Sequence, residues 1–312
     1  MTICVILLSM GGPDRLENVR PFLFNLFNDP AIMRIPQPFR WIVAFLISGI
    51  RAKRAKGIYQ RMGGHSPLLE NTRKQAVALQ AVLGTDYRCF VGMSYSHPFI
   101  YEAVHHAITL WPEQIVLLPL YPQYSTTTTF SALKEGRRAL ARAQFAGKVS
   151  IIDHFYDLPT YIDLLVERTK QAFSEAQEAG APRVLFSAHG LPERIVKQGD
   201  PYPDQCARLV DLILQKMGKK IDSVLCFQSR LGPVRWIGPF TDEEIVKAAQ
   251  DHRPIVIVPI SFVCEHAETL VELHQEGRSL AFEKGCPFYR VVETAGDNQQ
   301  FIQALAHVIR RC

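Results

Sequence analysis

The sequence predicts an α/β protein built from two doubly wound, parallel-sheet halves that are related by an internal duplication. Short runs of β-branched and aliphatic residues, bounded by Gly, Pro or Ser, alternate with longer helical stretches, as parallel strands and crossover helices do. The chain has 312 residues and is 47% hydrophobic, which is enough to bury a large core. Motifs of the first part of the chain also reappear in the same order in the second.

The strands are predicted from apolar runs that end in a turn or a proline. They are residues 3–9, 89–95, 115–120, 149–153, 184–188, 224–228 and 255–260. The longer stretches between them predict helices at residues 67–83, 99–110, 131–146, 161–179, 204–217, 242–251 and 268–284. Such alternation is typical of a parallel sheet that is covered on both faces.

The internal repeat has three matched parts. VILLSMGGP at residues 5–13 matches VLFSAHGLP at 184–192 as strand, turn and proline. Residues 89–98 resemble 225–233, and residues 115–120 resemble 255–260. We therefore expect two Rossmann-like halves, residues 1–155 and 156–312. Because ligands sit outside the carboxyl ends of parallel strands, we expect the active-site cleft between the halves.

His189 stands at the end of one of these strands, in LFSAHGLP. An imidazole in that place can take up protons or bind a metal. A structural histidine is the alternative interpretation, but Gly190 permits close backbone approach and Pro192 fixes the next turn. These neighbours favour a functional role.

An acidic row follows the strand at residues 255–260. Glu268, Glu272 and Glu276 are spaced i, i+4 and i+8, so a helix places them on one face, next to His266. Like charges stacked in this way repel each other, so the row suits carriage of divalent cations or protons; a solvated acidic face is the alternative. A metal held by His189 and Glu268 would keep open positions for a substrate.

Residues 39–56 form a separate amphipathic segment. Residues 39–50 are apolar with an aromatic start, and Arg51, Lys53, Arg54 and Lys56 follow at once. An apolar face beside a basic cluster is typical of a helix that rests on anionic lipid. A core helix with a solvated basic end is the alternative.

Composition excludes several other classes. The net charge of +5 is too small to indicate nucleic-acid binding. Seven scattered cysteines without a CxxC pair favour a reducing, cytoplasmic compartment. Residues 1–9 have no basic start and predict a core strand rather than a signal peptide, and no apolar run approaches the ~20 residues of a membrane span. The usual nucleotide-binding, hydrolase-elbow and zinc-protease motifs are missing.

Four motifs carry a resemblance to a known family. They are SAHGLP at 187–192, GDPYP at 199–203, FQSR at 227–230 with Gly232, Pro233 and Trp236, and HAETL at 266–270. With them the whole chain resembles the ferrochelatases, which insert ferrous iron into protoporphyrin IX to give haem.

The resemblance implies roles for particular residues. His189 and Glu268 match the catalytic and metal-binding pair that faces across the porphyrin plane. Glu272 and Glu276 match an acidic path for metal or protons, with His266 beside it. Porphyrin contacts would fall on Met10, Arg51, Arg54, Tyr59, Ser66, Tyr121, Trp236 and Phe262.

The resemblance also implies the partners. Protoporphyrin IX and Fe²⁺ would be the substrates, with peripheral contact to the inner membrane and no permanently bound cofactor. Relatives with a [2Fe-2S] cluster place a cysteine where this chain has Thr126 and several near the C-terminus, where it has only Cys312, so we expect no cluster. Ser94 stands where many members have arginine.

Several alternatives stay open at this point. A sister chelatase would act on sirohydrochlorin with cobalt or nickel, or on coproporphyrin III. The alternative outside the enzymes is a non-catalytic haem-binding or metal-binding protein, although the acidic row would then have no function. The protein would be a monomer or a homodimer.

Overall fold

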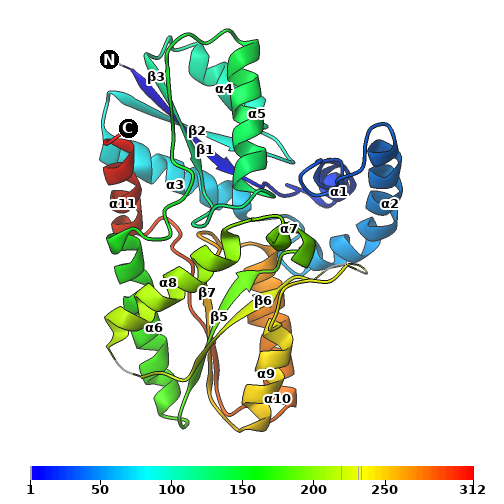
Figure 1. Ribbon diagram of the computed structural model, residues 1–312, viewed down its shortest axis with the longest axis vertical. Coiled ribbons are helices and arrows are strands. Elements are labelled where there is room, and N and C mark those ends of the chain that lie inside the picture. Colours follow the sequence, from blue (N-terminus) through cyan, green and yellow to red (C-terminus); the bar gives the residue numbers. More distant parts are fainter. Residues whose placement is uncertain (1, 219, 231, 233) are drawn as a thin grey trace. The chain divides into compact units, whose positions relative to one another are not determined.

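The computed structural model describes residues 2–218, 220–230, 232 and 234–312. The chain forms two compact units (Figure 1). Unit 1 runs to His154 and also contains Asp297–Cys312, and unit 2 contains Phe155–Gly296.

Unit 1 is built on a parallel sheet with the strand order β2-β1-β3-β4. Its strands are β1 (Ile3–Ser9), β2 (Tyr87–Met93), β3 (Gln114–Pro119) and β4 (Lys148–Ile151). Its helices are α1 (Val19–Phe27), α2 (Phe39–Gln60), α3 (Leu68–Leu83), α4 (Ile100–Ile108), α5 (Thr129–Arg142) and α11 (Gln299–Ile309). Helices α4 and α5 pack together beside β1, β2 and β3, and their apolar faces close the core with Ile6, Leu8 and Leu117.

Unit 2 repeats this plan with the order β6-β5-β7-β8, also fully parallel. Its strands are β5 (Arg183–His189), β6 (Ser223–Gln228), β7 (Ile255–Pro259) and β8 (Tyr289–Val291). Its helices are α6 (Pro159–Gln177), α7 (Glu193–Lys197), α8 (Tyr202–Met217), α9 (Thr241–Gln250), a π-helix (Glu268–Gly277) and α10 (Arg278–Glu283).

The predicted class is confirmed, because both units have parallel sheets with helices around them and the same strand order. All seven predicted strands are present to within two residues at each end. Strand β8 was not predicted, since three residues give no recognisable periodicity. Helices α1, α7 and α11 were also missed.

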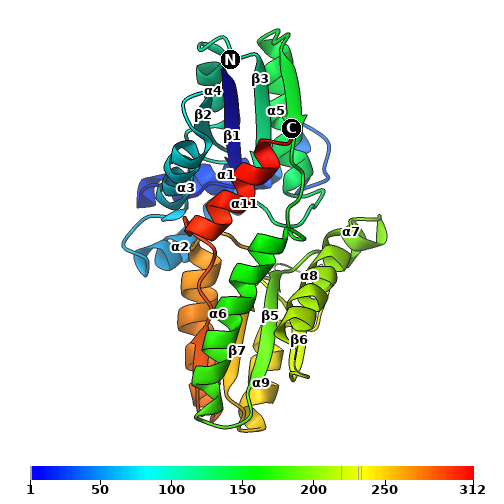
Figure 2. The same ribbon diagram turned by 90° about the vertical axis from the view of Figure 1, so that its left-hand side faces the viewer.

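The C-terminal segment differs from the expected division at residues 155 and 156. We expected it to belong to the second half, but α11 packs on α3 of unit 1 (Figure 2). Its buried face carries Phe301, Ile302 and Leu305. Arg310 also donates from Nη2 to the carbonyl oxygen of Val82 in α3 at 2.6 Å. The apolar face of α11 is buried against α3, and the chain therefore returns to unit 1 after β8.

The stretch 268–284 is also more complex than the single helix we expected. It begins as a ten-residue π-helix and continues as α10. Val271 and Leu273 of the π-helix are buried, and Leu273 belongs to the core cluster of unit 2. π-Helical turns are rare and are frequently found at functional sites.

All seven cysteines are free thiols. In the part of the chain that the structure describes, no helix combines the length and apolar character that a bilayer crossing requires.

Candidate metal and proton-transfer site

His189 is the last residue of β5 and lies opposite Gln228 of β6 in the parallel register. Its Nδ1 is 2.6 Å from the carbonyl oxygen of Gly190. A carbonyl oxygen can only accept, so Nδ1 carries the proton of the neutral ring. The lone pair of the neutral imidazole is therefore on Nε2, which is free to bind a proton or a metal.

Gly190 allows the strand end to be tightly covered. Its backbone N–H donates to the carbonyl oxygen of Gln228 at 2.8 Å. A Cβ atom here would lie 2.8 Å from that same oxygen and 3.2 Å from Cε3 of Trp236. The indole of Trp236 meets the His189 ring edge-on, with 6.4 Å between ring centroids. Trp236 also pairs with Pro192 in an antiparallel bridge, so the backbone after β5 fixes both rings.

Glu268 begins the π-helix and faces His189. Its Oε2 is 3.8 Å from Nε2 of His189, and the two side chains are 21% and 35% exposed. This Oε2 atom is buried and has no hydrogen-bond partner among the described residues. The separation is too long for a direct hydrogen bond.

Two acceptors therefore face each other across a short gap. Leaving a buried carboxylate oxygen without a partner costs free energy. A proton or a cation between the two groups would satisfy both. Nitrogen and oxygen ligands bind a divalent metal such as zinc at about 2.0–2.2 Å, so one ion can bridge this distance.

Glu272 is the next carboxylate of the row. Burial and, next, the charge of Glu268 raise its pKa to about 7. The hydroxyl of Ser229 donates to Oε2 of Glu272 at 2.7 Å. This hydrogen bond and the charge of His189 lower the pKa of Glu272 and so offset part of the rise. Glu272 is therefore able to take up and release a proton near neutral pH.

Ser229 holds an unusual backbone conformation to make that contact. Its φ is +66°, in the left-handed region that is sparsely populated by residues other than glycine. Ser229 belongs to the FQSR motif, but the sequence predicted no role for it. Its side-chain partner lies 43 residues along the chain, so no local pattern could have found it.

His266 and Thr269 form the start of the π-helix. The Nδ1 atom of His266 accepts from the backbone N–H of Thr269 at 3.3 Å, and the backbone N–H of His266 donates to Oγ1 of Thr269 at 3.0 Å. Phe262 packs edge-on against His266, with 4.5 Å between ring centroids. These two hydrogen bonds fix the turn of backbone that carries Ala267 and Glu268. Thr269 was not among the residues predicted from the sequence.

Gly277 closes the π-helix at its other end. A Cβ atom there would lie 2.5 Å from the hydroxyl oxygen of Tyr289, which donates to the carbonyl oxygen of Leu273 at 2.8 Å. Both ends of the helix that carries Glu268 and Glu272 are therefore fixed. Glu276, the third member, is exposed, and its charge further raises the pKa of Glu272.

The remaining predicted contact residues lie in unit 1. Met10 follows β1, and the turn after it packs on Ser66, since a Cβ on Gly12 would lie 2.4 Å from the Ser66 hydroxyl. Tyr121 follows β3. Tyr59, Arg51 and Arg54 belong to α2, where Tyr59 is buried. Burial and the charge of Arg54 lower the pKa of Arg51.

Unit 2 therefore brings together His189, Glu268, Glu272 and Trp236, and places Phe262 against His266. Pro233, part of the motif around Trp236, lies outside the described residues. Within the described ranges, no set of three or more His, Cys, Asp and Glu side chains is arranged to hold a metal ion.

The chain therefore combines two parallel sheets of the same strand order with a histidine and a glutamate that face each other at the end of one strand. The fold agrees with that of a solved sirohydrochlorin chelatase, SirB from Bacillus subtilis subspecies spizizenii in complex with cobalt. The TM-score is 0.58 at 11% identity, over 100% of this chain and 95% of the other.

The chain belongs to the ferrochelatase family, whose model matches residues 2–312. It is 45% identical over 310 residues to the ferrochelatase of Hyphomonas neptunium, and the aligned region covers 97% of this chain and 85% of the relative. It is 42% identical over 311 residues to that of a Wolbachia strain from Drosophila simulans, with 98% of each chain covered.

Proposed function

We propose that this protein inserts ferrous iron into protoporphyrin IX and releases two protons, forming protohaem in haem biosynthesis. The observation that supports this best is the pairing of Nε2 of His189 with Oε2 of Glu268 at 3.8 Å. Metal insertion requires a base for the pyrrole protons and an anionic group for the incoming cation. The pair supplies both, and family membership gives the reaction class.

His189 acts as the general base. Because the carbonyl of Gly190 fixes the proton on Nδ1, the lone pair on Nε2 is available for a pyrrole N–H. Glu268 acts as the anionic partner, since its Oε2 atom is buried without a hydrogen bond and gains most from an approaching cation.

The acidic row then moves charge away from the reacting centre. Glu272 has a pKa of about 7, raised first by burial, so it can accept a proton and pass it on. Glu276 is exposed and forms the solvent end of the row. His266 contributes by holding the first turn of the π-helix.

The walls of the porphyrin site are assigned by the resemblance and by local geometry. Trp236 lies beside His189 and Phe262 beside His266, so both rings stand next to groups of the reacting centre. By the resemblance alone, Met10, Tyr59, Ser66 and Tyr121 would also contact the porphyrin, and Arg51 and Arg54 would pair with its propionates. Aromatic and aliphatic contacts of this kind would hold the macrocycle in a bent form, in which its nitrogen lone pairs are open to the metal.

An anaerobic absorbance assay tests the proposal. Fe²⁺ is mixed with protoporphyrin IX, coproporphyrin III or sirohydrochlorin, and we expect multiple turnovers with protoporphyrin. Faster insertion into coproporphyrin III or sirohydrochlorin would identify that tetrapyrrole as the substrate and contradict the assignment of protoporphyrin IX. A stoichiometric spectral change without turnover would indicate a haem-binding or metal-binding protein. His189→Ala should abolish insertion and still bind porphyrin.

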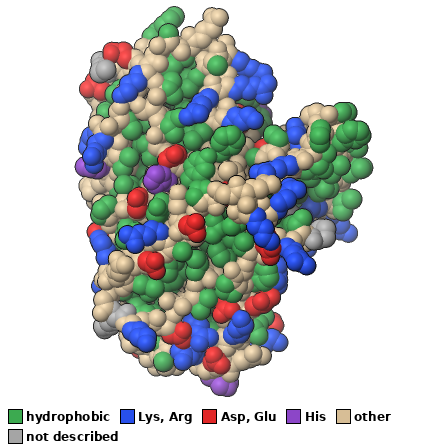
Figure 3. Space-filling view, in the orientation of Figure 1, with side chains coloured by type: hydrophobic (Ala, Val, Ile, Leu, Met, Phe, Trp, Pro, Cys, Tyr) green, Lys and Arg blue, Asp and Glu red, His purple; other side chains and the backbone are tan. Residues whose placement is uncertain are grey.

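Helix α2 gives the protein a surface for anionic lipid, and we place the protein in the cytoplasm at the inner membrane. Its exposed apolar side chains include Phe39, Trp41, Phe45 and Leu46. Figure 3 shows apolar side chains gathered over α2 with Lys and Arg beside them. Burial of the apolar side chains and attraction of the basic ones would add together.

Vesicle sedimentation tests the lipid contact. We expect binding to vesicles with anionic lipid, weaker binding to neutral ones, and loss of binding in Trp41→Ser with Phe45→Ser. Trp111→Ser removes a tryptophan that is 88% exposed outside α2, and it should bind as the unchanged protein does. Equal binding by both variants would contradict a role for α2. We further propose that the protein carries no [2Fe-2S] cluster; acid-labile sulfide in the purified protein would contradict this.

A further inference from the structure

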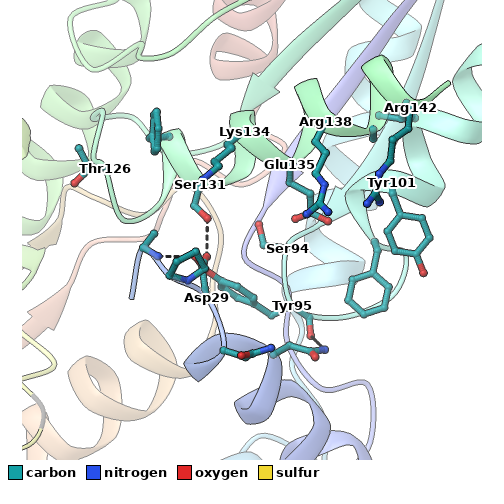
Figure 4. Close-up of a pocket in the computed structure, with 18 of the residues that line it drawn as sticks. Asp29, Ser94, Tyr95, Tyr101, Thr126, Ser131, Lys134, Glu135, Arg138 and Arg142 are labelled. Atoms are coloured by element: carbon teal, nitrogen blue, oxygen red, sulfur yellow. Dashed lines mark hydrogen bonds between the residues drawn. The ribbon is translucent and has the colours of Figure 1, made fainter. Parts of the chain in front are cut away.

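Unit 1 contains a large cavity that the proposed reaction does not use. Its volume is about 1120 Å³, and all of its lining residues belong to unit 1. It is bounded by the segment between α1 and α2, the end of β2, and helices α4 and α5 (Figure 4).

The lining of this cavity is strongly basic. Five Lys and Arg side chains line it against two carboxylates, Asp29 and Glu135. The five basic residues are Arg34, Arg40, Lys134, Arg138 and Arg142. Three of them follow one another along α5, across the cavity from Asp29 and Tyr95 (Figure 4).

The charges of the α5 row are not neutralised by the protein. Lys134, Arg138 and Arg142 are spaced i, i+4 and i+8, and all three are exposed. None of them forms a hydrogen bond or an ion pair with any residue that the structure describes. Like charges at this spacing destabilise a helix, and a helix face that serves only solubility usually alternates acids with bases. The row therefore offers three free donors of one sign.

The two carboxylates do little to cancel this charge. Asp29 is buried and already accepts from the hydroxyls of Tyr95 and Ser131, each at 2.6 Å, and from the backbone N–H of Ala31 at 2.7 Å. Burial and then the charge of Asp29 raise the pKa of Glu135 to about 7, against the opposing effect of Arg138. Glu135 is therefore only partly charged near neutral pH.

Aromatic side chains form the other wall. Phe99 and Tyr101 stack with 5.6 Å between ring centroids, and Phe130, which belongs to α5 and is 47% exposed, adds a third aromatic ring to the lining. Apolar walls around charges of one sign concentrate the electric field in a cleft and raise the local concentration of counter-ions. A concave site of this kind favours a small soluble ion over a flat membrane surface.

We propose that this cavity binds a small, extended polyanion, whose phosphate or carboxylate groups are held by Lys134, Arg138 and Arg142. The row spans about 12 Å along α5, at 1.5 Å per residue, so it can hold several anionic groups of one ligand. Guanidinium groups bind phosphate and carboxylate oxygens in pairs, which gives the site its preference for such groups.

Titration calorimetry on the full chain tests the proposal, with tripolyphosphate and citrate as probes of the two anion types. We expect saturable binding of at least one probe, weakened about tenfold in Arg138→Gln, since a hydrogen bond to a charged group is worth at least 1.4 kcal/mol. Arg137→Gln is the matched control, because it removes the same charge from the same helix outside the cavity. Its affinity should change less than twofold.

Each outcome decides the matter. Binding of tripolyphosphate alone assigns a phosphate ligand, and binding of citrate alone assigns a carboxylate ligand. Equal losses in the two variants would show a general effect of net charge and overturn the site, as would the absence of saturable binding. Circular dichroism confirms that both variants are folded, and iron insertion by Arg138→Gln should match that of the unchanged protein.

Discussion

The same crossover connection carries opposite charges in the two units. In unit 1 it is α5, between β3 and β4, with a basic row at Lys134, Arg138 and Arg142. In unit 2 it is the π-helix with α10, between β7 and β8, with an acidic row at Glu268, Glu272 and Glu276.

The rows also differ in their surroundings. The basic side chains are exposed and without partners among the described residues, whereas Glu268 and Glu272 are largely buried beside His189. One connection between matching strands therefore serves two kinds of chemistry. The strand order fixes where the connection lies, and the side chains and helix type decide what it binds.

The largest effect is expected from the first residue of each row. Glu268→Gln removes the anion that faces His189, and we expect iron insertion to fall by about 10²–10⁴-fold, the usual contribution of a positioned acid or base. Lys134→Gln is the matched change in unit 1 and should leave insertion within twofold. Anaerobic initial rates measure both. Equal losses would mean that the rows do not differ in function.

The second residue of each row should separate them by pH. The pKa of Glu272 is about 7, so it is protonated below that pH and charged above it. If it accepts protons during insertion, the rate should fall as the pH drops through 7. Glu272→Gln should be at least about tenfold slower, because an amide cannot take up the proton. Its rate should also no longer fall as the pH drops through 7; we call this fall the acidic limb of the pH profile.

The control for this pH profile is Arg138→Gln, in which the acidic limb should lie at the same pH as in the unchanged protein. Ser229→Ala removes a hydrogen bond that lowers the pKa of Glu272, so it should move the limb to higher pH. A limb that is unchanged in all three variants would assign it to another group.

The third comparison concerns the free energy of unfolding. The pKa of Glu272 is raised in the folded state, so its favourable contribution is complete at pH below its unfolded value, near 4.5, and is lost as the pH rises through about 7. At pH 8 we expect Glu272→Gln to be more stable than the unchanged protein by on the order of 1–3 kcal/mol, with little gain at pH 5. Chemical denaturation at the two pH values measures this difference.

The smallest effect is expected from the exposed row. Arg138→Gln relieves two like-charge contacts, which should stabilise the protein by a few tenths of a kcal/mol at either pH. High salt should remove that gain, since it screens exposed charges. A large, pH-dependent gain would place Arg138 in a buried environment and contradict the comparison.

The sequence was sufficient to predict the internal repeat and the positions of seven strands. Parallel strands that are buried on both faces form continuous apolar runs, which are easy to recognise. It also predicted that His189 and Glu268 belong together. The pairing came from the position of both residues after strands of one predicted sheet and was reinforced by the resemblance, since 79 residues of chain separate the two and no local pattern connects them.

Other features depend on contacts that a sequence does not display. The four-residue spacing of the acidic row fits an α-helix and a π-helix alike, and the contact of Tyr289 with Leu273 at the end of the π-helix is formed only on folding. The left-handed backbone of Ser229 and the return of α11 to α3 also depend on distant partners. Strand β8 has only three residues and is held by β7.

Anomalous scattering from crystals soaked in Zn²⁺ or Co²⁺ tests the central claim most directly. We expect a metal about 2.0–2.2 Å from both Nε2 of His189 and a carboxylate oxygen of Glu268. A metal bound elsewhere in protein that is active in insertion, with these two side chains turned apart, would contradict it.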